Sequence, residues 1–382
     1  MRSIFVLFLF FSVNVLGEVV HFRIDSEILG EEVTARVSLP DTYHHSESFS
    51  YPLLVILDGS TQFNHMASSV HFYSTYAVIP EMIVVGISTQ DRLAYFTPTE
   101  PEAYAGRSGK ADKLTKFLED EFSGILSEKY RISPYSIISG HSLSGLYTSY
   151  LAINNESMFD AAISISPSLW WDDSSLIDDY KGSHASKENK PFRWFLSMAN
   201  EPNEMPSAFN GMLQALNDMP RSGLYFSYAR FPNETHDSTP LVGNAKGLQA
   251  VFSGWNAVPE IDVMSLSELK EFYSSKVDEY GYLFPLSVHQ YNVYGLKAAY
   301  EGKTDWGIEI LEQGAKEFPD SEILWDSLAT AYKLGGKLKG AMSASDRAVK
   351  LAEETNSIFL SEINTQNAQL RATQVEGSLG DI

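Results

Sequence analysis

The chain contains no cysteine among its 382 residues. This absence excludes disulfide bonds, metal sites built on thiolates and a cysteine nucleophile. The fold must therefore be stabilised by a hydrophobic core, and a chain of this length can form one large catalytic domain and a smaller one. Hydrophobic residues make up 44% and charged residues 20% of the sequence, which is a globular composition.

Positive charge is scarce. The sequence has 28 Lys and Arg against 49 Asp and Glu, which gives a formal net charge of −21. A field of this sign argues against nucleic acid or an anionic membrane surface as a partner, because no basic patch would easily dominate it. The net charge does not fix the charge of a small substrate, since a local pocket can oppose the global field.

Long hydrophobic runs are absent beyond the N-terminus, where Ile4 to Val13 is almost continuously apolar. Met1-Arg2-Ser3 gives this run a positive start, and Val15-Leu16-Gly17 offers compact residues at the positions that a signal peptidase reads. The run is shorter than the ~20 apolar residues of a membrane span. We predict a signal peptide over residues 1–17, no membrane span after its cleavage, and a periplasmic or secreted bacterial protein.

Between about Glu18 and Trp255, apolar strand patterns alternate with amphipathic helical patterns. The helical spacing over Lys110–Tyr130 and Pro206–Asp218 predicts an α/β fold, with a mostly parallel sheet and helices on both faces. The predicted strands are Val19–Ile24, Val33–Leu39, Pro52–Leu57, Met82–Ile87, Tyr135–Ser139, Ala161–Ile165, Trp194–Met198 and Leu224–Arg230. We assign this domain to residues 18–258 and expect ligands at the carboxyl ends of its strands.

After Pro259 the strand signals stop, and the pattern predicts an all-α domain over residues 262–372 with a flexible tail over residues 373–382. Large and small residues recur there at an offset of 34 residues. The members Tyr291, Gly295, Gly307, Leu311 and Gly314 correspond to Trp325, Ala329, Ala341, Ser345 and Ala348. The set resembles the tetratricopeptide repeat, although ordinary helical hairpins produce similar spacing. Because two units bury little surface, we expect them to pack on the preceding domain.

Residues 136–145 read Ser-Ile-Ile-Ser-Gly-His-Ser-Leu-Ser-Gly, an apolar strand that leads into a helix. A nucleophile elbow needs this context, because a tight turn lifts a serine hydroxyl above the sheet at the N-terminus of the next helix. Ser142 is the candidate nucleophile, and Gly140 supplies the small residue two positions before it. Ser144 occupies the position where a second glycine is usual, so the motif is imperfect.

A serine nucleophile needs a base, and the base needs an orienting carboxylate. In this fold the chain order is serine, acid, histidine. His236 follows the last apolar strand and precedes a helical pattern, which is the required place. Glu201 is the first carboxylate after the strand Trp194–Met198, and Glu204 is the alternative. His141, beside the nucleophile, is expected to pack locally and to point away from the hydroxyl.

The oxyanion of the reaction requires two backbone N–H donors. One donor is expected from Leu143, at the start of the helix after the nucleophile. The other is expected from the loop that follows Leu53 to Leu57, at Gly59 or Ser60.

The sequence resembles the esterase-D-like esterases of the α/β-hydrolase fold, which include the enterochelin and related siderophore esterases. The resemblance covers about Glu18 to Trp255. It is carried by Leu57-Asp58-Gly59, Pro80 to Ile87, Asp91-Arg92 with Thr97-Pro98-Thr99, Gly140-His141-Ser142, and Ile165 to Asp172. It implies ester hydrolysis through a serine, a carboxylate and a histidine, at the positions of Ser142, Glu201 and His236, without a metal or other cofactor.

The sequence also departs from this family. Besides Ser144, the stretch after Arg92 lacks the second arginine that many relatives have there. A ferric siderophore is strongly anionic, so its binding would favour basic residues. Arg92 is either a substrate contact or part of a surface salt bridge. Trp170 and Trp171 are candidates for lining the substrate pocket, or for the core.

The leading prediction is therefore a serine carboxylic ester hydrolase that acts through an acyl-enzyme on a small-molecule ester, with a siderophore-type ester as the narrower possibility. An acyltransferase on the same fold is one alternative. A non-catalytic protein that binds a protein partner through the helical repeats is the other.

Overall fold

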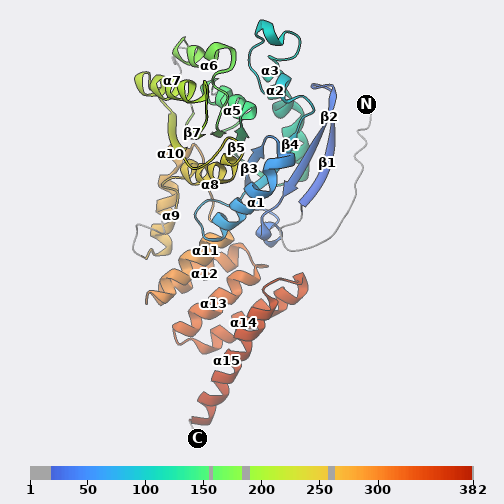
Figure 1. The fold of residues 1–382 in the computed structure, drawn as a ribbon. Coiled ribbons are helices and arrows are strands. Elements are labelled where there is room, and N and C mark those ends of the chain that lie inside the picture. The colour runs from blue at the N-terminus through green and yellow to red at the C-terminus, as the bar shows by residue number, and fades with distance from the viewer. Residues whose placement is uncertain (1–18, 155–157, 183–189, 257–262, 381–382) are drawn as a thin grey trace.

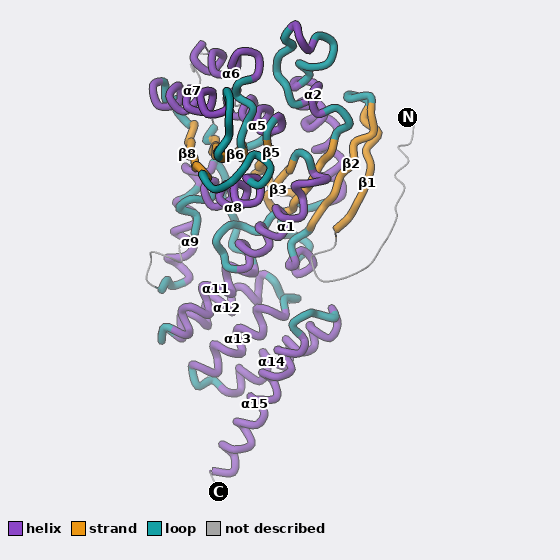
Figure 2. The backbone as a smooth tube through the Cα atoms, viewed as in Figure 1, coloured by secondary structure: helices purple, strands orange, loops and turns teal. Residues whose placement is uncertain are grey.

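The computed structural model describes residues 19–154, 158–182, 190–256 and 263–380. An α/β domain carries the sheet, and an all-helical region follows it in the chain (Figures 1 and 2). The predicted signal peptide lies outside the described residues. Among the described residues, no helix is both long and apolar enough to cross a membrane.

The sheet has eight strands in the order β1-β2-β4-β3-β5-β6-β7-β8. The pairs β1–β2 and β2–β4 are antiparallel, and the other neighbours are parallel. The strands are β1 (Val19–Ser26), β2 (Glu31–Ser38), β3 (Tyr51–Ile56), β4 (Ile83–Ser88), β5 (Ile132–His141), β6 (Ala161–Ile165), β7 (Phe192–Ala199) and β8 (Leu224–Phe231). Every predicted strand is present close to its predicted position, and the mostly parallel sheet is confirmed.

Each face of the sheet is buried under helices, which is why the central strands read as unbroken apolar runs. On β3, Leu53 and Val55 join the core under α3 to α7, whereas Leu54 and Ile56 join the core under α1 and α8. The helices of this domain are α1 (Gly59–Thr75), α2 (Arg92–Tyr95), α3 (Ala111–Phe117), α4 (Ser123–Lys129), α5 (Leu143–Asn154), α6 (Trp171–Gly182), α7 (Met205–Asp218) and α8 (Thr239–Val251). Short 3-10 turns lie at Asp41–His45 and Glu102–Tyr104, and a π turn, Leu118–Phe122, joins α3 to α4.

The C-terminal region consists of packed helices. They are α9 (Leu266–Ser275), α10 (Val277–Tyr280), α11 (Val288–Tyr300), α12 (Thr304–Glu317), α13 (Glu322–Leu334), α14 (Leu338–Thr355) and α15 (Leu360–Gly380). Glycine allows α11 and α12 to approach closely, because a Cβ on Gly295 would lie 2.5 Å from Leu311 Cγ and one on Gly307 would lie 2.6 Å from the Gly295 carbonyl oxygen. The recurring small residues therefore have a packing cause. Helix α15 continues beyond Ala372, through most of the stretch predicted as a tail.

The helical region docks on the edge of the sheet where the parallel strands begin. Tyr135, near the start of β5, contacts the Phe284 ring at a centroid distance of 4.9 Å. Arg193, at the start of β7, forms a 2.8 Å ion pair with Glu279. The second core runs without interruption from the α1 and α8 face of the sheet into helices α11 to α14. The helical region thus lies at the opposite end of the domain from α6 and α7 (Figure 1).

Candidate active site

Ser142 lies in the turn between β5 and α5, at the carboxyl edge of the sheet. Its φ of 61° is in the left-handed region, which a residue other than glycine occupies at a cost of about 1–3 kcal/mol. The turn is held from both sides, since the Ser142 N–H donates to the Ile165 carbonyl at 3.0 Å and the Ser142 carbonyl accepts from the Ser168 N–H at 3.1 Å. This is the strained strand-turn-helix geometry that exposes a nucleophile.

Two glycines let the strand and the helix meet at this turn. A Cβ on Gly140 would lie 2.3 Å from the Ser144 carbonyl oxygen, and one on Gly145 would lie 2.9 Å from the Ile165 carbonyl oxygen. The space that a second motif glycine would provide is therefore supplied by Gly145. Ser144 is fully buried in spite of its polar side chain.

His236 and Glu201 form a direct pair. His236 Nδ1 lies 2.7 Å from Glu201 Oε1, with the Glu201 side chain 1% exposed and the His236 side chain 37% exposed. Both follow adjacent parallel strands, because Ala199 at the end of β7 is paired with Phe231 at the end of β8. A buried carboxylate on Nδ1 fixes the ring orientation and presents Nε2 to the pocket.

One pocket contains all three side chains. It is lined by Ser142, Ser168, Trp170, Glu201, Pro202, Asn203, Glu204, Met205 and His236. Glu204 lies at the exposed side of this pocket, next to the start of α7, whereas Glu201 is buried against the histidine. The geometry therefore favours Glu201 over Glu204 as the orienting acid.

Two further residues, His141 and Ser168, lie at this site, although the sequence analysis gave neither a role in it. The His141 ring packs on the His236 ring with centroids 4.5 Å apart, so it contacts the candidate base itself. Burial and then the neighbouring His236 lower the pKa of His141 to about 4, which keeps its ring neutral at pH 7. Ser168 Oγ lies 3.5 Å from Ser142 Oγ. The position of His141 beside the nucleophile was the available signal for the first, and the sequence offered none for the second.

The expected oxyanion donors differ in availability. Leu143 begins α5, directly after the nucleophile. Gly59 begins α1 and packs against β4, where a Cβ would lie 2.5 Å from the Gly86 carbonyl carbon. The Ser60 N–H donates to Ser88 Oγ at 2.9 Å, so this amide already has an acceptor. Of Gly59 and Ser60, the two residues expected to supply the second oxyanion donor, the structure disfavours Ser60.

Two of the three expected substrate contacts have other partners. Arg92 forms a bidentate ion pair with Asp58, at 2.5 Å and 2.8 Å, which is the salt-bridge alternative. Trp171 belongs to the core, where its indole N–H donates to Thr99 Oγ1 at 3.1 Å. Neither residue lines the pocket around Ser142, whereas Trp170 does.

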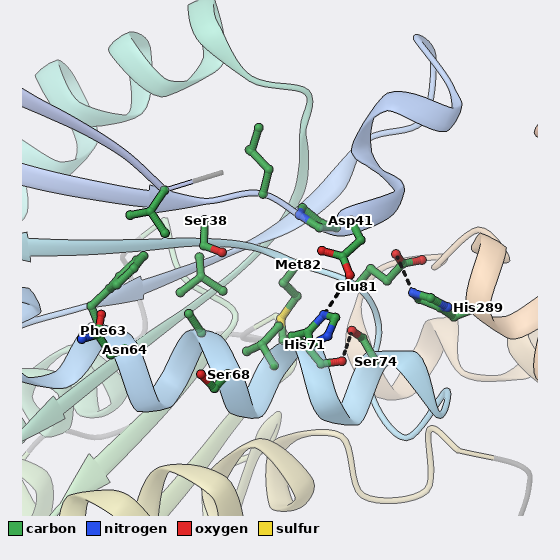
Figure 3. Close-up of a pocket in the computed structure, with 16 residues that line it drawn as sticks. Ser38, Asp41, Phe63, Asn64, Ser68, His71, Ser74, Glu81, Met82 and His289 are labelled. Carbon is green, nitrogen blue, oxygen red and sulfur yellow. Dashed lines mark hydrogen bonds and ion pairs between the residues drawn. The ribbon is translucent and has the colours of Figure 1, made fainter. Parts of the chain in front are cut away.

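A second pocket lies beside α1, near the docked helices (Figure 3). Its histidines are each paired with a carboxylate, His71 with Asp41 at 3.2 Å and His289 with Glu81 at 3.6 Å. The Ser74 hydroxyl there donates to the His71 carbonyl. Within the described ranges, no group of three or more His, Asp or Glu side chains is arranged to hold a metal ion. None of the serines that line the second pocket, Ser38, Ser68 and Ser74, has the left-handed backbone of Ser142, so the pocket of Ser142 is the candidate active site.

Comparison with known proteins finds similarity to esterases in the α/β domain. A family model described as "Putative esterase" matches residues 26–208. Ferri-bacillibactin esterase BesA of Bacillus subtilis is 25% identical over 214 residues, which cover 49% of this chain and 74% of that protein.

Solved structures match a larger share of the chain. An IroE-like serine hydrolase from Shewanella oneidensis superposes with a TM-score of 0.70 at 24% identity, covering 79% of this chain and 100% of that one. An uncharacterised protein from Capnocytophaga ochracea has a TM-score of 0.57 at 16% identity and covers 93% of this chain and 100% of its own. At these identities the likeness concerns the fold, which in the second case extends over nearly the whole chain.

Proposed function

We propose that the protein is a carboxylic ester hydrolase that acts through an acyl-enzyme on Ser142, with His236 as the base and Glu201 as the orienting acid. The match of residues 26–208 to the esterase model and the similarity to a siderophore esterase support this proposal. The observation that carries the proposal is a strained serine turn that shares one pocket with a 2.7 Å His236–Glu201 pair.

In the first half of the reaction, His236 Nε2 takes the proton of Ser142 Oγ as this oxygen attacks the ester carbonyl carbon. The tetrahedral intermediate collapses when the bond to the alcohol oxygen breaks, and the imidazolium returns the proton to that oxygen. In the second half, water adds to the acyl carbon with His236 as base. The bond to Ser142 Oγ then breaks, the imidazolium returns the proton to that oxygen, and the carboxylic acid leaves.

Two local features support the electrostatics of these steps. The Glu201 carboxylate, buried at 2.7 Å from Nδ1, stabilises the imidazolium that forms during attack. The amide of Leu143, at the N-terminus of α5, is the proposed first oxyanion donor, and the amide of Gly59 is the second. The neutral His141 ring against His236 adds no competing positive charge at pH 7.

The substrate class that fits this pocket is a small-molecule ester. The lining of this pocket combines the apolar side chains of Trp170 and Met205 with the polar side chains of Ser142 and His236. Relatedness to a protein named as a ferri-bacillibactin esterase supports a siderophore-type ester as the narrower candidate. The pocket as described has no lysine or arginine in its lining, and Arg92 is occupied by Asp58, so a multiply anionic ligand would find no cation there.

The test is release of nitrophenol from short-chain nitrophenyl esters by the wild type and by Ser142→Ala. We expect the variant to lose about 10³-fold or more in kcat/KM, and a fluorophosphonate to label the wild type and spare the variant. Equal rates in the two proteins would refute the nucleophile. Product analysis with competing alcohols would detect acyl transfer, and an unlabelled, inactive wild type would favour the non-catalytic alternative.

We also propose that the chain is exported, which its apolar N-terminal run supports, and that the C-terminal helices serve as a repeat-type surface for a protein partner. The placement of these helices supports a role other than covering the active site, because they dock at the amino edge of the sheet (Figure 1). Mass measurement of the mature N-terminus tests the first proposal. Pull-down with the full chain, compared with a variant that carries charged substitutions at the exposed Tyr300 and Leu334 of the helical region, tests the second.

A further inference from the structure

Ser144, which replaces the usual motif glycine, has a fully used hydroxyl group. Its Oγ accepts a hydrogen bond from the His141 N–H at 2.8 Å. Its single proton faces two acceptors, Asp58 Oδ2 at 2.8 Å and the His141 carbonyl at 2.8 Å. The residue is 0% exposed. A serine retained only because it is small would not need three polar partners in a buried position.

Asp58 is itself held firmly. It lies between β3 and α1 with a φ of 54°, and its carboxylate receives two hydrogen bonds from Arg92, at 2.5 Å and 2.8 Å. Asp58 directly precedes Gly59, the proposed oxyanion donor. The Ser144 hydroxyl therefore connects the turn that carries the nucleophile to the loop that is proposed to hold the oxyanion.

The same contact reaches the base through His141. The backbone of His141 is fixed by the Ser144 hydroxyl, and its ring packs at 4.5 Å on the ring of His236. His236 in turn is bound to Glu201. One chain of contacts thus runs from Arg92 through Asp58, Ser144 and His141 to the catalytic pair.

We propose that Ser144 is a positioning residue, which uses Asp58 and Arg92 as a fixed anchor to hold the nucleophile turn, the oxyanion loop and the base in register. The proposal rests on the proposed function of Ser142 and His236. A glycine at this position could hold the turn only through packing. The hydroxyl of Ser144 adds hydrogen bonds to His141 and Asp58. A displacement of about 1 Å between such groups is enough to lower the rate of the chemical step about 100-fold.

The experiment compares Ser144→Ala and Ser144→Gly with wild type and with Ser149→Ala. Ser149 is a matched control, because it is a buried serine on the same helix whose hydroxyl donates only to the Gly145 carbonyl, at 2.7 Å. We expect both Ser144 variants to lose about 10- to 100-fold in kcat for nitrophenyl esters, with KM changed by less than about threefold. Fluorophosphonate labelling should slow in parallel, and the pH profile of kcat/KM should shift. The control should keep wild-type kinetics.

A double-mutant cycle separates positioning from a general loss of stability. If Ser144 acts through Asp58, then Ser144→Ala should cost less than about threefold in kcat when Asp58 is already Asn. Asparagine tolerates the left-handed backbone of this position. If the effects of the two substitutions on kcat were fully additive, Ser144 would not act through Asp58. Wild-type kcat in both Ser144 variants would overturn the whole proposal. If the wild type itself is unlabelled and inactive, the proposed function fails instead, so the two failures are distinguishable.

Discussion

The two edges of one sheet differ in nearly every physical respect. At the carboxyl edge, backbone strain and polar side chains collect around an open pocket, with Ser142 and Asp58 in the left-handed region. At the amino edge, aromatic rings and paired charges are sealed under the helical region, as Tyr135 and the His45–Glu322 pair illustrate. The carboxyl edge thus holds the proposed catalytic residues, and the amino edge is a packing interface.

This division has a physical reason. Parallel strands bring their carboxyl ends together, and the loops and helix N-termini that follow supply donors and charged groups at that edge. Backbone strain there lowers the free energy of unfolding and must be offset elsewhere. The continuous second core, from the sheet into α11 to α14, provides that compensation. Substitutions at the two edges should therefore separate activity from stability.

The largest separation is expected for Glu201→Gln. The amide keeps the size of the buried side chain but removes the charge, 2.7 Å from Nδ1, that is proposed to stabilise the imidazolium. We expect kcat/KM for nitrophenyl esters to fall by up to about 10⁴-fold, or ~5.5 kcal/mol of transition-state stabilisation, with little change in stability. Glu204→Gln in the same pocket is the control and should stay within about threefold of wild type. A larger loss in the Glu204 variant would exchange the roles of the two residues.

At the opposite edge, Glu322→Ala should act on stability alone. Glu322 is buried, lies 3.2 Å from His45 Nε2 and accepts a 2.7 Å hydrogen bond from Ser357. Removing one member of a buried pair leaves the other uncompensated, so we expect the free energy of unfolding at pH 7 to fall by about 3 kcal/mol. Urea denaturation followed by circular dichroism measures this loss, and kcat/KM under native conditions should be unchanged.

The same variant has a defined pH dependence. Burial alone would raise the pKa of Glu322, but the hydrogen bonds and charge of His45 and the bond from Ser357 outweigh it and lower this pKa. A lowered pKa in the folded state stabilises the protein above the unfolded value of 4.5, and that contribution is lost as the pH falls through the folded-state value. The stability difference between wild type and Glu322→Ala should therefore shrink below pH 4.5. A difference that grows on acidification would contradict this assignment.

A matched pair of glycine substitutions, one beside Ser142 and one in the helical region, should separate activity from stability with smaller effects. A Cβ on Gly140 would lie 2.3 Å from the Ser144 carbonyl oxygen, and one on Gly295 would lie 2.5 Å from Leu311 Cγ. Both alanine variants should lose about 1–3 kcal/mol of stability through overpacking. Gly140→Ala should also lose activity, because α5 moves relative to β5, whereas Gly295→Ala should not. Thermal unfolding and ester hydrolysis measured on both proteins would test this, and equal activity losses would remove the contrast.

The sequence predicts those features of the candidate active site that depend on residues close together in the chain. The turn at Ser142 was predictable, because the strand, the small residue and the helix are consecutive in the chain. Glu201 and His236 were predictable as residues that follow strands, and the pairing of Ala199 with Phe231 explains why the two meet.

Other features depend on contacts between distant loops and carry no local signal. The Ser60 amide donates a hydrogen bond to Ser88, and Arg92 forms an ion pair with Asp58. Both contacts depend on how separate loops pack. The same applies to Trp171, whose indole finds Thr99. The sequence also did not predict which edge of the sheet the helical region covers. Apolar periodicity predicts that Tyr135 is buried, but not that the helical region buries it.

The smallest effect is expected where the two regions meet through one aromatic contact. Phe49, just before β3, packs on Phe318 of the helical region with ring centroids 5.3 Å apart. Phe318→Leu keeps an apolar side chain in this buried position but removes the ring pair, so stability should fall by about 1 kcal/mol. Kinetic constants for ester hydrolysis should match wild type, because β3 leads into the proposed oxyanion loop at Asp58 and Gly59 only at its other end. A changed kcat with an unchanged Tm would mean that the helical region influences the active site through the sheet, and that the two edges are coupled.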